Sequence, residues 1–204
     1  MLIERPPQLY RIFFKGALFR IPSGKNPGKV YLTFDDGPIP ESTPWILDVL
    51  DQHNVKATFF MVGQNVERYP ELFQQTVARG HRPGNHTLHH IRGLSLSVGD
   101  YLKDAEEGAK LTGSNLMRPP HGYLTPAQFK ALRSRYKVVM MDVLTRDYSK
   151  NVDAKGIVKN VKNYVRDGSI IVFHDSLKSI EKLKIALPEA IRWLQSQGYE
   201  FGVL

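Results

Sequence analysis

Two adjacent carboxylates, Asp35 and Asp36, end the apolar run 30–34 and stand directly before Gly37-Pro38. Asp-Gly-Pro is good turn chemistry by itself, which accounts for Asp36 but not for a second carboxylate at the end of an apolar strand. Successive strand side chains point to opposite faces, yet a turn can bring both carboxylates into one site by different routes. The pair therefore indicates a site that uses carboxylate oxygens for metal binding or proton transfer.

Three of the seven histidines fall within five residues, as His86, His89 and His90. If this segment is helical, His86 and His90 stand one turn apart on the same face and can share a metal ion. Imidazole nitrogens suit zinc and neighbouring transition metals. The chain has no cysteine, which excludes thiolate ligands and disulfides. With one carboxylate these histidines would make a two-His, one-Asp set; a structural or merely exposed histidine is the alternative for each.

Three further groups follow in the chain. Arg118 precedes a stiff Pro-Pro pair and His121, and it could be held beside a carboxylate; an ordinary Pro-rich loop is the alternative. Asp147 and Tyr148 come shortly after an apolar run. His174 ends the apolar run 170–173, where a histidine is well placed for acid–base work or serves as a capping residue.

The elements that must position these groups alternate between apolar β-branched runs and helical patterns. Such alternation predicts a parallel α/β architecture, here six or seven units in one domain. No Gly-rich dinucleotide loop follows the first strand, which favours a barrel over an open sheet. Active sites of such barrels lie at the carboxyl ends of strands, where the polar residues above fall. The expected strands are 30–34, 57–62, 137–143, 169–173 and 199–204, and the expected helices are 70–78, 98–111 and 154–166.

Local sequence signals predict where three more helices begin. Thr43 resembles an N-cap with Pro44 at the first helical position. Thr125 and Gln128 have the spacing of a capping box that opens a helix ending near residue 136. Pro188 is expected to start the last helix.

Composition and net charge indicate which classes of partner the protein could bind. The chain has 204 residues and a formal net charge of +8, and such a basic surface attracts nucleic acid, anionic lipid or acidic wall polymer. No long Lys/Arg run or nucleic-acid motif is present, so we expect no nucleic-acid partner. Residues 1–7 do not read as a signal peptide and no run approaches the roughly 20 apolar residues of a membrane span. We therefore expect a cytoplasmic protein, with peripheral membrane or cell-envelope association as alternatives; segment 9–21 suits core packing better than a membrane surface.

Taken in order, these groups resemble the NodB-homology polysaccharide deacetylases, carbohydrate esterase family 4. The resemblance rests on Thr-Phe-Asp-Asp-Gly-Pro at 33–38 and His-Thr-x-x-His at 86–90, and it extends from about residue 30 to 175. It implies a distorted (β/α)7-type barrel as a single domain. We expect residues 30–204 to form the catalytic domain and residues 1–29 to form an N-terminal segment packed on the barrel.

The resemblance also implies an activity: metal-dependent removal of N-acetyl groups from a GlcNAc-containing polysaccharide or oligosaccharide. Asp36, His86 and His90 match the ligands of one divalent metal ion. Zinc is the expected ion, with cobalt, nickel and manganese as alternatives. Asp35 matches the general base that activates water, and Arg118 the residue that orients it. The acetylated glycan is the expected partner, and peptidoglycan is favoured because a basic protein suits an anionic wall polymer.

The remaining roles follow by position. The backbone N–H of His121 matches an oxyanion donor, and His174 matches the general acid that protonates the departing amine. Asp147 is the implied partner of His174, but Asp142 remains an alternative because the family often has another Asp where Leu144 stands. The residues expected to line the acetyl pocket are Tyr148 and Val172.

Two departures concern aromatic positions, since the family often has an aromatic residue at His121 and a tryptophan at Tyr148. Several alternatives stay open: O-acetyl removal, chitin-like oligomers, an amidase for a small cyclic or lipid-linked substrate, a non-catalytic carbohydrate-binding barrel, and a two-His, one-carboxylate iron oxygenase. The presence of Asp35 and His174 argues against the binding barrel. Strand–helix alternation argues against the oxygenase. The sequence predicts no oligomeric state.

Overall fold

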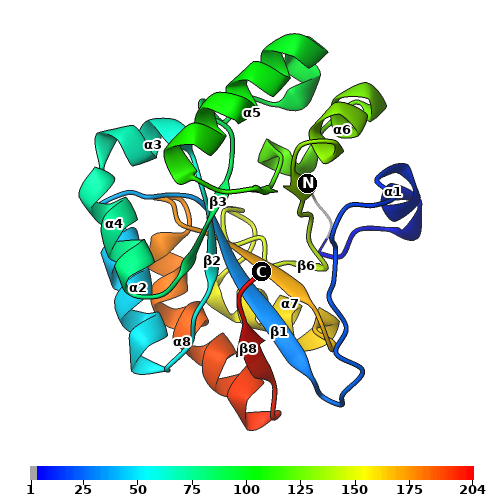
Figure 1. Cartoon of the computed structure of the whole chain (residues 1–204). Helices are drawn as coiled ribbons and strands as arrows, with labels where there is room; N and C mark the ends of the chain where they lie inside the picture. Colours follow the sequence, from blue (N-terminus) through cyan, green and yellow to red (C-terminus); the bar gives the residue numbers. More distant parts are fainter. Residues whose placement is uncertain (1–3) are drawn as a thin grey trace.

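A parallel sheet of eight strands organises the computed structural model, which describes residues 4–204 (Figure 1). Its order is β5-β4-β3-β2-β1-β7-β6, and β8 pairs with the first half of β1. The strands are β1 (Lys29–Asp36), β2 (Thr58–Met61), β3 (Arg82–Asn85), β4 (Leu116–Met117), β5 (Lys137–Val138), β6 (Val143–Leu144), β7 (Ile170–His174) and β8 (Glu200–Gly202). The helices are α1 (Gln8–Phe13), α2 (Thr43–Gln52), α3 (Gly63–Arg68), α4 (Pro70–Ala78), α5 (Val98–Thr112), α6 (Pro126–Arg133), α7 (Ala154–Tyr164) and α8 (Ile180–Ser196).

The two edge strands, β5 and β6, belong to one run of chain. The sequence predicts a single strand over 137–143; instead this run pairs with β4 at its start and with β7 at its end. Between the two pairings the N-terminal segment adds a bridge: the Leu18 N–H donates to the Val138 carbonyl and the Met140 N–H donates to the Leu18 carbonyl, each at 2.8 Å. The parallel sheet therefore curls into the predicted α/β barrel, distorted where these short edge strands meet.

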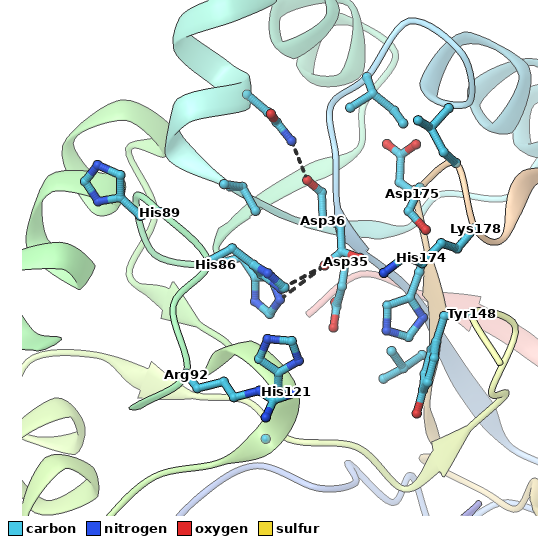
Figure 2. Close-up of a pocket in the computed structure, with 18 of the residues that line it drawn as sticks. Asp35, Asp36, His86, His89, Arg92, His121, Tyr148, His174, Asp175 and Lys178 are labelled. Carbon is cyan, nitrogen blue, oxygen red and sulfur yellow. Dashed lines mark hydrogen bonds and ion pairs between the residues drawn. The ribbon is translucent and has the colours of Figure 1, made fainter. Parts of the chain in front are cut away.

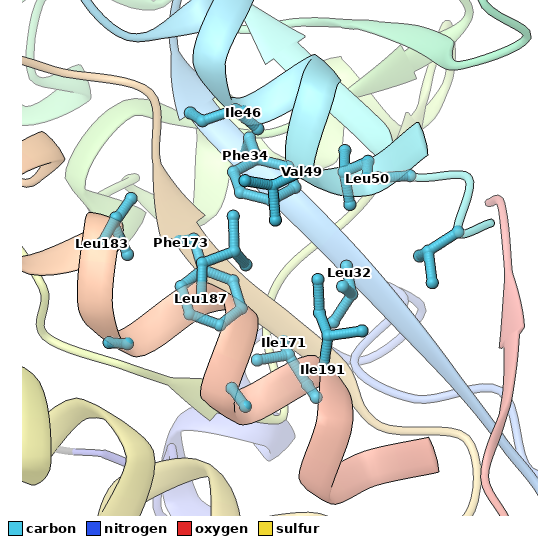
Figure 3. Close-up of a cluster of buried hydrophobic side chains, with 14 of the residues drawn as sticks. Leu32, Phe34, Ile46, Val49, Leu50, Ile171, Phe173, Leu183, Leu187 and Ile191 are labelled. Carbon is cyan, nitrogen blue, oxygen red and sulfur yellow. The ribbon is translucent and has the colours of Figure 1, made fainter. Parts of the chain in front are cut away.

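Alternation along β1 decides which side chains reach the interior. Leu32 and Phe34 face outward and pack against α2 and α8 in the largest hydrophobic cluster (Figure 3). Complete burial of each such side chain contributes about 1.5–3 kcal/mol. Tyr31 lies in a separate cluster that also includes Phe60. The odd-numbered positions of β1 therefore face the inside of the barrel, and Asp35 is one of them.

Asp142 connects the N-terminal segment to the barrel. Its side chain is fully buried, accepts hydrogen bonds from Arg11 (2.6 Å), Arg166 (2.8 Å) and Ser169 (2.8 Å), and makes ion pairs with both arginines. Burial alone would raise the pKa of Asp142, but the hydrogen bonds from Arg166, Arg11 and Ser169 lower it to about 2. Asp142 is therefore occupied by these partners, and it is not the carboxylate that contacts His174.

We expect Asp142→Asn to lower the free energy of unfolding by about 2–3 kcal/mol, because it removes a charge that two arginines stabilise and each unit of a depressed pKa corresponds to about 1.4 kcal/mol. The melting temperature should fall by about 5–10 °C for a chain of this size. The pKa of Asp142 in the folded protein lies below the unfolded value of about 3.9. The difference in stability between wild type and variant is therefore fully present above that pH and disappears as the pH falls toward 2. Thermal unfolding at pH 7 and at low pH measures both effects. Glu67→Gln, an exposed change of the same charge, is the control; equal melting temperatures for the two variants would contradict the assignment.

Several local predictions need correction. Pro188 does not start the last helix; it lies inside α8, which already begins at Ile180. The helix after Ser42 includes Thr43 as its first residue, so the N-cap is one residue earlier than predicted. β3 was not predicted, because its sequence Arg-Pro-Gly-Asn lacks an apolar run. The capping box of Thr125 and Gln128 is confirmed.

The predicted segment 9–21 divides its side chains between core and surface. Phe14 and Phe19 are buried, whereas Ile12 and Phe13 on α1 are each 64% exposed. Residues 1–3 of the expected N-terminal segment lie outside the described residues, and its boundary at residue 30 stays a prediction. Within residues 4–204, no helix is long and apolar enough to cross a membrane.

Candidate active site

A cavity of about 720 Å³ opens at the carboxyl ends of β1 and β7 (Figure 2). Eight of the ten site residues expected from the sequence line it: Asp35, Asp36, His86, His90, His121, Tyr148, Val172 and His174. The other two, Arg118 and Asp147, are buried and hydrogen-bond to lining residues. The site therefore consists of eight residues that line the cavity and of two buried residues that hold lining residues in position.

Asp35 and Asp36 reach the same cavity because the backbone turns at Asp36. Asp36 has φ of +84°, in the left-handed region that non-glycine residues rarely adopt. The Asn65 side-chain amide donates to the Asp36 carbonyl at 2.8 Å and holds this turn. At Gly37 a Cβ atom would overlap the Asp175 carboxylate, so glycine is required by close approach. An unturned strand would direct one of the two carboxylates away from the cavity.

Asp36, His86 and His90 form a cluster whose three ligand atoms lie within 4.8 Å of one another. The Nε2 atoms of His86 and His90 lie 3.7 Å and 3.1 Å from Asp36 Oδ1. His86 Nδ1 lies 2.7 Å from the Arg118 carbonyl oxygen. A carbonyl can only accept, so Nδ1 carries the proton and the Nε2 lone pair is directed at the cluster.

The segment that carries the histidines is a loop, so the one-turn helical spacing considered for His86 and His90 does not apply. His86 directly follows β3, and His90 is reached through a loop in which Thr87 and His90 have φ of +65° and +56°. The Thr87 hydroxyl accepts from the His90 N–H at 3.1 Å and tightens the loop. Loop curvature, rather than a helical turn, brings the two imidazoles to one side.

The charge states of the cluster suit a cation. Burial lowers the pKa of His86 to about 4, so its imidazole is neutral and available as a ligand at pH 7. Burial would raise the pKa of Asp36, but the His90 hydrogen bond and the charge of His174 hold it well below its usual range. Two imidazoles and one carboxylate form a donor set that divalent transition metals prefer.

Arg118 is buried behind Asp35. Its guanidinium donates to Asp35 Oδ1 at 2.6 Å and to the Thr33 hydroxyl at 2.7 Å, and it stacks 4.0 Å from the centroid of the Phe60 ring. The same residue's carbonyl accepts from His86. Arg118 thus couples the position of Asp35 to that of the metal-binding cluster.

His174 lies on another wall of the cavity with Asp147 behind it. His174 Nδ1 and its backbone N–H each lie 2.7 Å from an Asp147 carboxylate oxygen. The carboxylate accepts both hydrogens, so Nε2 is the nitrogen that faces away from it. Burial would lower the pKa of His174, but the charge and hydrogen bond of Asp147 raise it to about 9. His174 is therefore a cation at pH 7 and can donate a proton.

We expect Asp147→Asn to shift the alkaline limb of the pH profile of kcat/KM toward lower pH. The raised pKa keeps His174 protonated until pH approaches 9; without the carboxylate it should fall to or below about 6.5. The activity that depends on protonated His174 would then be lost from near neutral pH upward. A pH–rate profile measures this, with Asp142→Asn at a temperature where it is folded as the control. An unmoved limb in Asp147→Asn, or an equal shift in the control, would contradict the pairing.

His121, Tyr148 and Val172 line the same cavity, and the Tyr148 ring lies 4.8 Å from that of His174. His121 has φ of +59°, so its backbone departs from a regular turn. The Tyr10 hydroxyl donates to the Gly122 carbonyl at 2.6 Å, which connects α1 to this loop. The sequence offered no signal for Tyr10, because its partner is more than a hundred residues away.

Asp175 is a second residue that the sequence reasoning did not assign, although it follows His174 directly. Ser42 and Thr43 donate to its buried carboxylate, Thr43 at 2.6 Å, and its own N–H donates to the Asp35 carbonyl at 2.7 Å. Burial raises the pKa of Asp175 to about 7. Asp175 holds the start of α2 against the ends of β1 and β7.

Comparison with known proteins identifies this arrangement. The family model described as polysaccharide deacetylase matches residues 22–138. The chain belongs to the polysaccharide deacetylase family. This confirms the family expected from the motifs, whose members are hydrolases that act on carbon–nitrogen bonds other than peptide bonds.

Three relatives agree with this family. A peptidoglycan-N-acetylglucosamine deacetylase of Bacillus cereus is 36% identical over 180 residues, covering 84% of each chain. A chitooligosaccharide deacetylase of a Bradyrhizobium species is 38% identical over 195 residues, covering 86% of this chain and 88% of that protein. A crystal structure of a peptidoglycan N-acetylglucosamine deacetylase superposes with a TM-score of 0.87 at 32% identity, covering 98% of this chain and 95% of that one. The predicted barrel fold and deacetylase class are therefore confirmed.

Proposed function

We propose that this polysaccharide deacetylase removes N-acetyl groups from N-acetylglucosamine residues of peptidoglycan. One observation carries the chemistry: Asp35, held by buried Arg118, lies beside the Asp36–His86–His90 cluster, and His174, its register partner on β7, lines the same cavity. Such a site has a base, a metal-binding set and an acid around one space. The Bacillus cereus relative supports the choice of polymer.

Asp36, His86 and His90 would hold the divalent ion that the family uses. Such an ion, when bound, polarises the amide carbonyl and makes water more acidic. Zinc is the proposed ion because two imidazoles and one carboxylate leave positions open for water and substrate; cobalt, nickel and manganese are alternatives.

Asp35 takes the proton of the attacking water. Arg118 donates to only one of its carboxylate oxygens, Oδ1, so the other oxygen can accept. The backbone N–H of His121 stabilises the developing oxyanion, a contribution of about 3–4 kcal/mol for one well-placed donor. Tyr148 and Val172 enclose the methyl group of the acetyl, because both line the cavity beside His174.

His174 completes the reaction. An amine cannot leave as an anion, so the nitrogen must receive a proton as the carbon–nitrogen bond breaks. His174 holds that proton at neutral pH because Asp147 raises its pKa to about 9. Asp35 and His174 thus have opposite roles in the reaction: Asp35 accepts a proton from water, and His174 donates one to the leaving amine.

A second candidate is the deacetylation of chitooligosaccharides, which the Bradyrhizobium relative supports. O-acetyl removal and a lipid-linked or cyclic amide substrate use the same chemistry and remain alternatives. Cell-envelope association fits a peptidoglycan substrate better than the cytoplasmic location expected from residues 1–7. Fractionation of cells that produce the native protein tests that location.

Product analysis tests the function. Purified peptidoglycan glycan strands, chitooligosaccharides and O-acetylated xylan are incubated separately with the metal-loaded protein, and acetate and free amines are quantified. We expect acetate and glucosamine amines in equal amounts from the glycan strands. Acetate release from the xylan alone would overturn the N-acetyl assignment, and no acetate from any substrate would overturn the deacetylase proposal.

A further inference from the structure

Two positively charged side chains in the cavity have no role in the chemistry above. Arg92 follows the histidine loop and Lys178 lies between β7 and α8; both are exposed and both line the cavity. Neither side chain makes a hydrogen bond or ion pair with any of residues 4–204. Both side chains can therefore interact with a negatively charged group on a bound molecule.

The acidic residues of the cavity are already engaged. Asp35 pairs with Arg118, Asp175 accepts from Ser42 and Thr43, and Asp36 belongs to the histidine cluster. These are the carboxylates that line the cavity in the part of the chain that the structure describes. Arg92 and Lys178 therefore have no acidic neighbour on the cavity wall to neutralise them.

The two cations lie on different sides of the reacting centre. Figure 2 shows Arg92 beside His121 and Lys178 beside His174, with Asp35 between the two groups. A sugar whose acetamide reaches Asp35 would lie between them. Its neighbours along a glycan would then extend toward one cation each.

We infer that Arg92 and Lys178 select a glycan that carries anionic groups on the sugars adjacent to the deacetylated residue. A carboxylate accepts well from a guanidinium or an ammonium group. In a strand where N-acetylglucosamine alternates with N-acetylmuramic acid whose lactyl groups are free acids, each internal N-acetylglucosamine has a carboxylate on both sides. One phosphate group would instead need both cations on one side. This inference rests on the proposed deacetylase function and assigns two residues that select its substrate.

Matched substrates test the inference. The kcat/KM for acetate release is measured on glycan strands with free carboxylates, on the same strands with methyl-esterified carboxylates, and on chitooligosaccharides of equal length. Wild type is compared with Arg92→Gln, Lys178→Gln and Lys155→Gln. Lys155 is exposed on α7 and does not line the cavity, so its variant has the same charge loss elsewhere.

We expect each cavity variant to lower the ratio of kcat/KM for free over esterified strands by about three- to tenfold, the range for an exposed charge-assisted contact. Lys155→Gln should keep the wild-type ratio. Added salt should reduce the wild-type ratio as well, since exposed charges are screened.

Two results would overturn the inference while the proposed function stands: equal ratios in all four proteins, or a wild-type preference for esterified strands. Absence of acetate from every substrate would instead overturn the proposed function itself.

Discussion

Asp35→Asn is expected to reduce kcat for acetate release by about 10²–10⁴-fold, the usual contribution of a positioned general base. The amide keeps the size of the side chain but accepts protons poorly. Arg118 retains an oxygen to donate to, so its buried guanidinium keeps a hydrogen-bond partner. Steady-state kinetics on glycan strands measures the loss, and metal content by elemental analysis shows whether the Asp36 cluster is intact.

The matched variant is Asp36→Asn, which should lose metal affinity as well as activity because Asp36 supplies a carboxylate to the cluster. The two neighbours therefore differ in one readout, the bound metal. If Asp35→Asn lost metal and Asp36→Asn retained it, the assignment of base and ligand would be reversed.

His174→Gln should reduce the rate of amide hydrolysis by about 10²–10⁴-fold while metal binding stays unchanged. Its physical reason is the leaving group, since an amine must be protonated to depart. An activated aryl acetate has a leaving group that needs no proton. We therefore expect this variant to hydrolyse the aryl ester far better, relative to wild type, than it hydrolyses the glycan amide.

Comparison with Asp35→Asn sharpens that test, because a general base serves both substrates. Asp35→Asn should lose the ester and the amide activities together, whereas His174→Gln separates them. Equal losses on both substrates in His174→Gln would show that His174 does not act as the acid. Loss of metal in that variant would make His174 a ligand.

Much of the fold followed from patterns that depend on near neighbours. The apolar runs of β1 and β7 predict buried parallel strands, and the capping box at Thr125 identifies the start of α6. The failures have a different origin. β3 is formed by Arg-Pro-Gly-Asn, whose pairing with β2 is a property of the sheet and not of its own residues.

The site shows the same division between residue types and backbone paths. Motif spacing identified the residues that line the cavity. It could not show the backbone path between His86 and His90, where a loop with two left-handed residues, and not a helical turn, brings the imidazoles together. Strand periodicity places Asp35 and Asp36 on opposite faces, and only the turn at Asp36 explains how both serve one cavity. Contacts such as Tyr10 to Gly122 depend on how the N-terminal segment packs on the barrel.

The most direct test of the central claim is acetate release from glycan strands as a function of bound metal. Protein freed of metal by a chelator is titrated with zinc, and metal content and rate are measured on the same samples. We expect no acetate from the metal-free protein and a rate that rises in proportion to zinc bound, with Asp36→Ala neither binding zinc nor gaining activity. A full rate in verified metal-free protein, or wild-type zinc affinity in Asp36→Ala, would contradict the account.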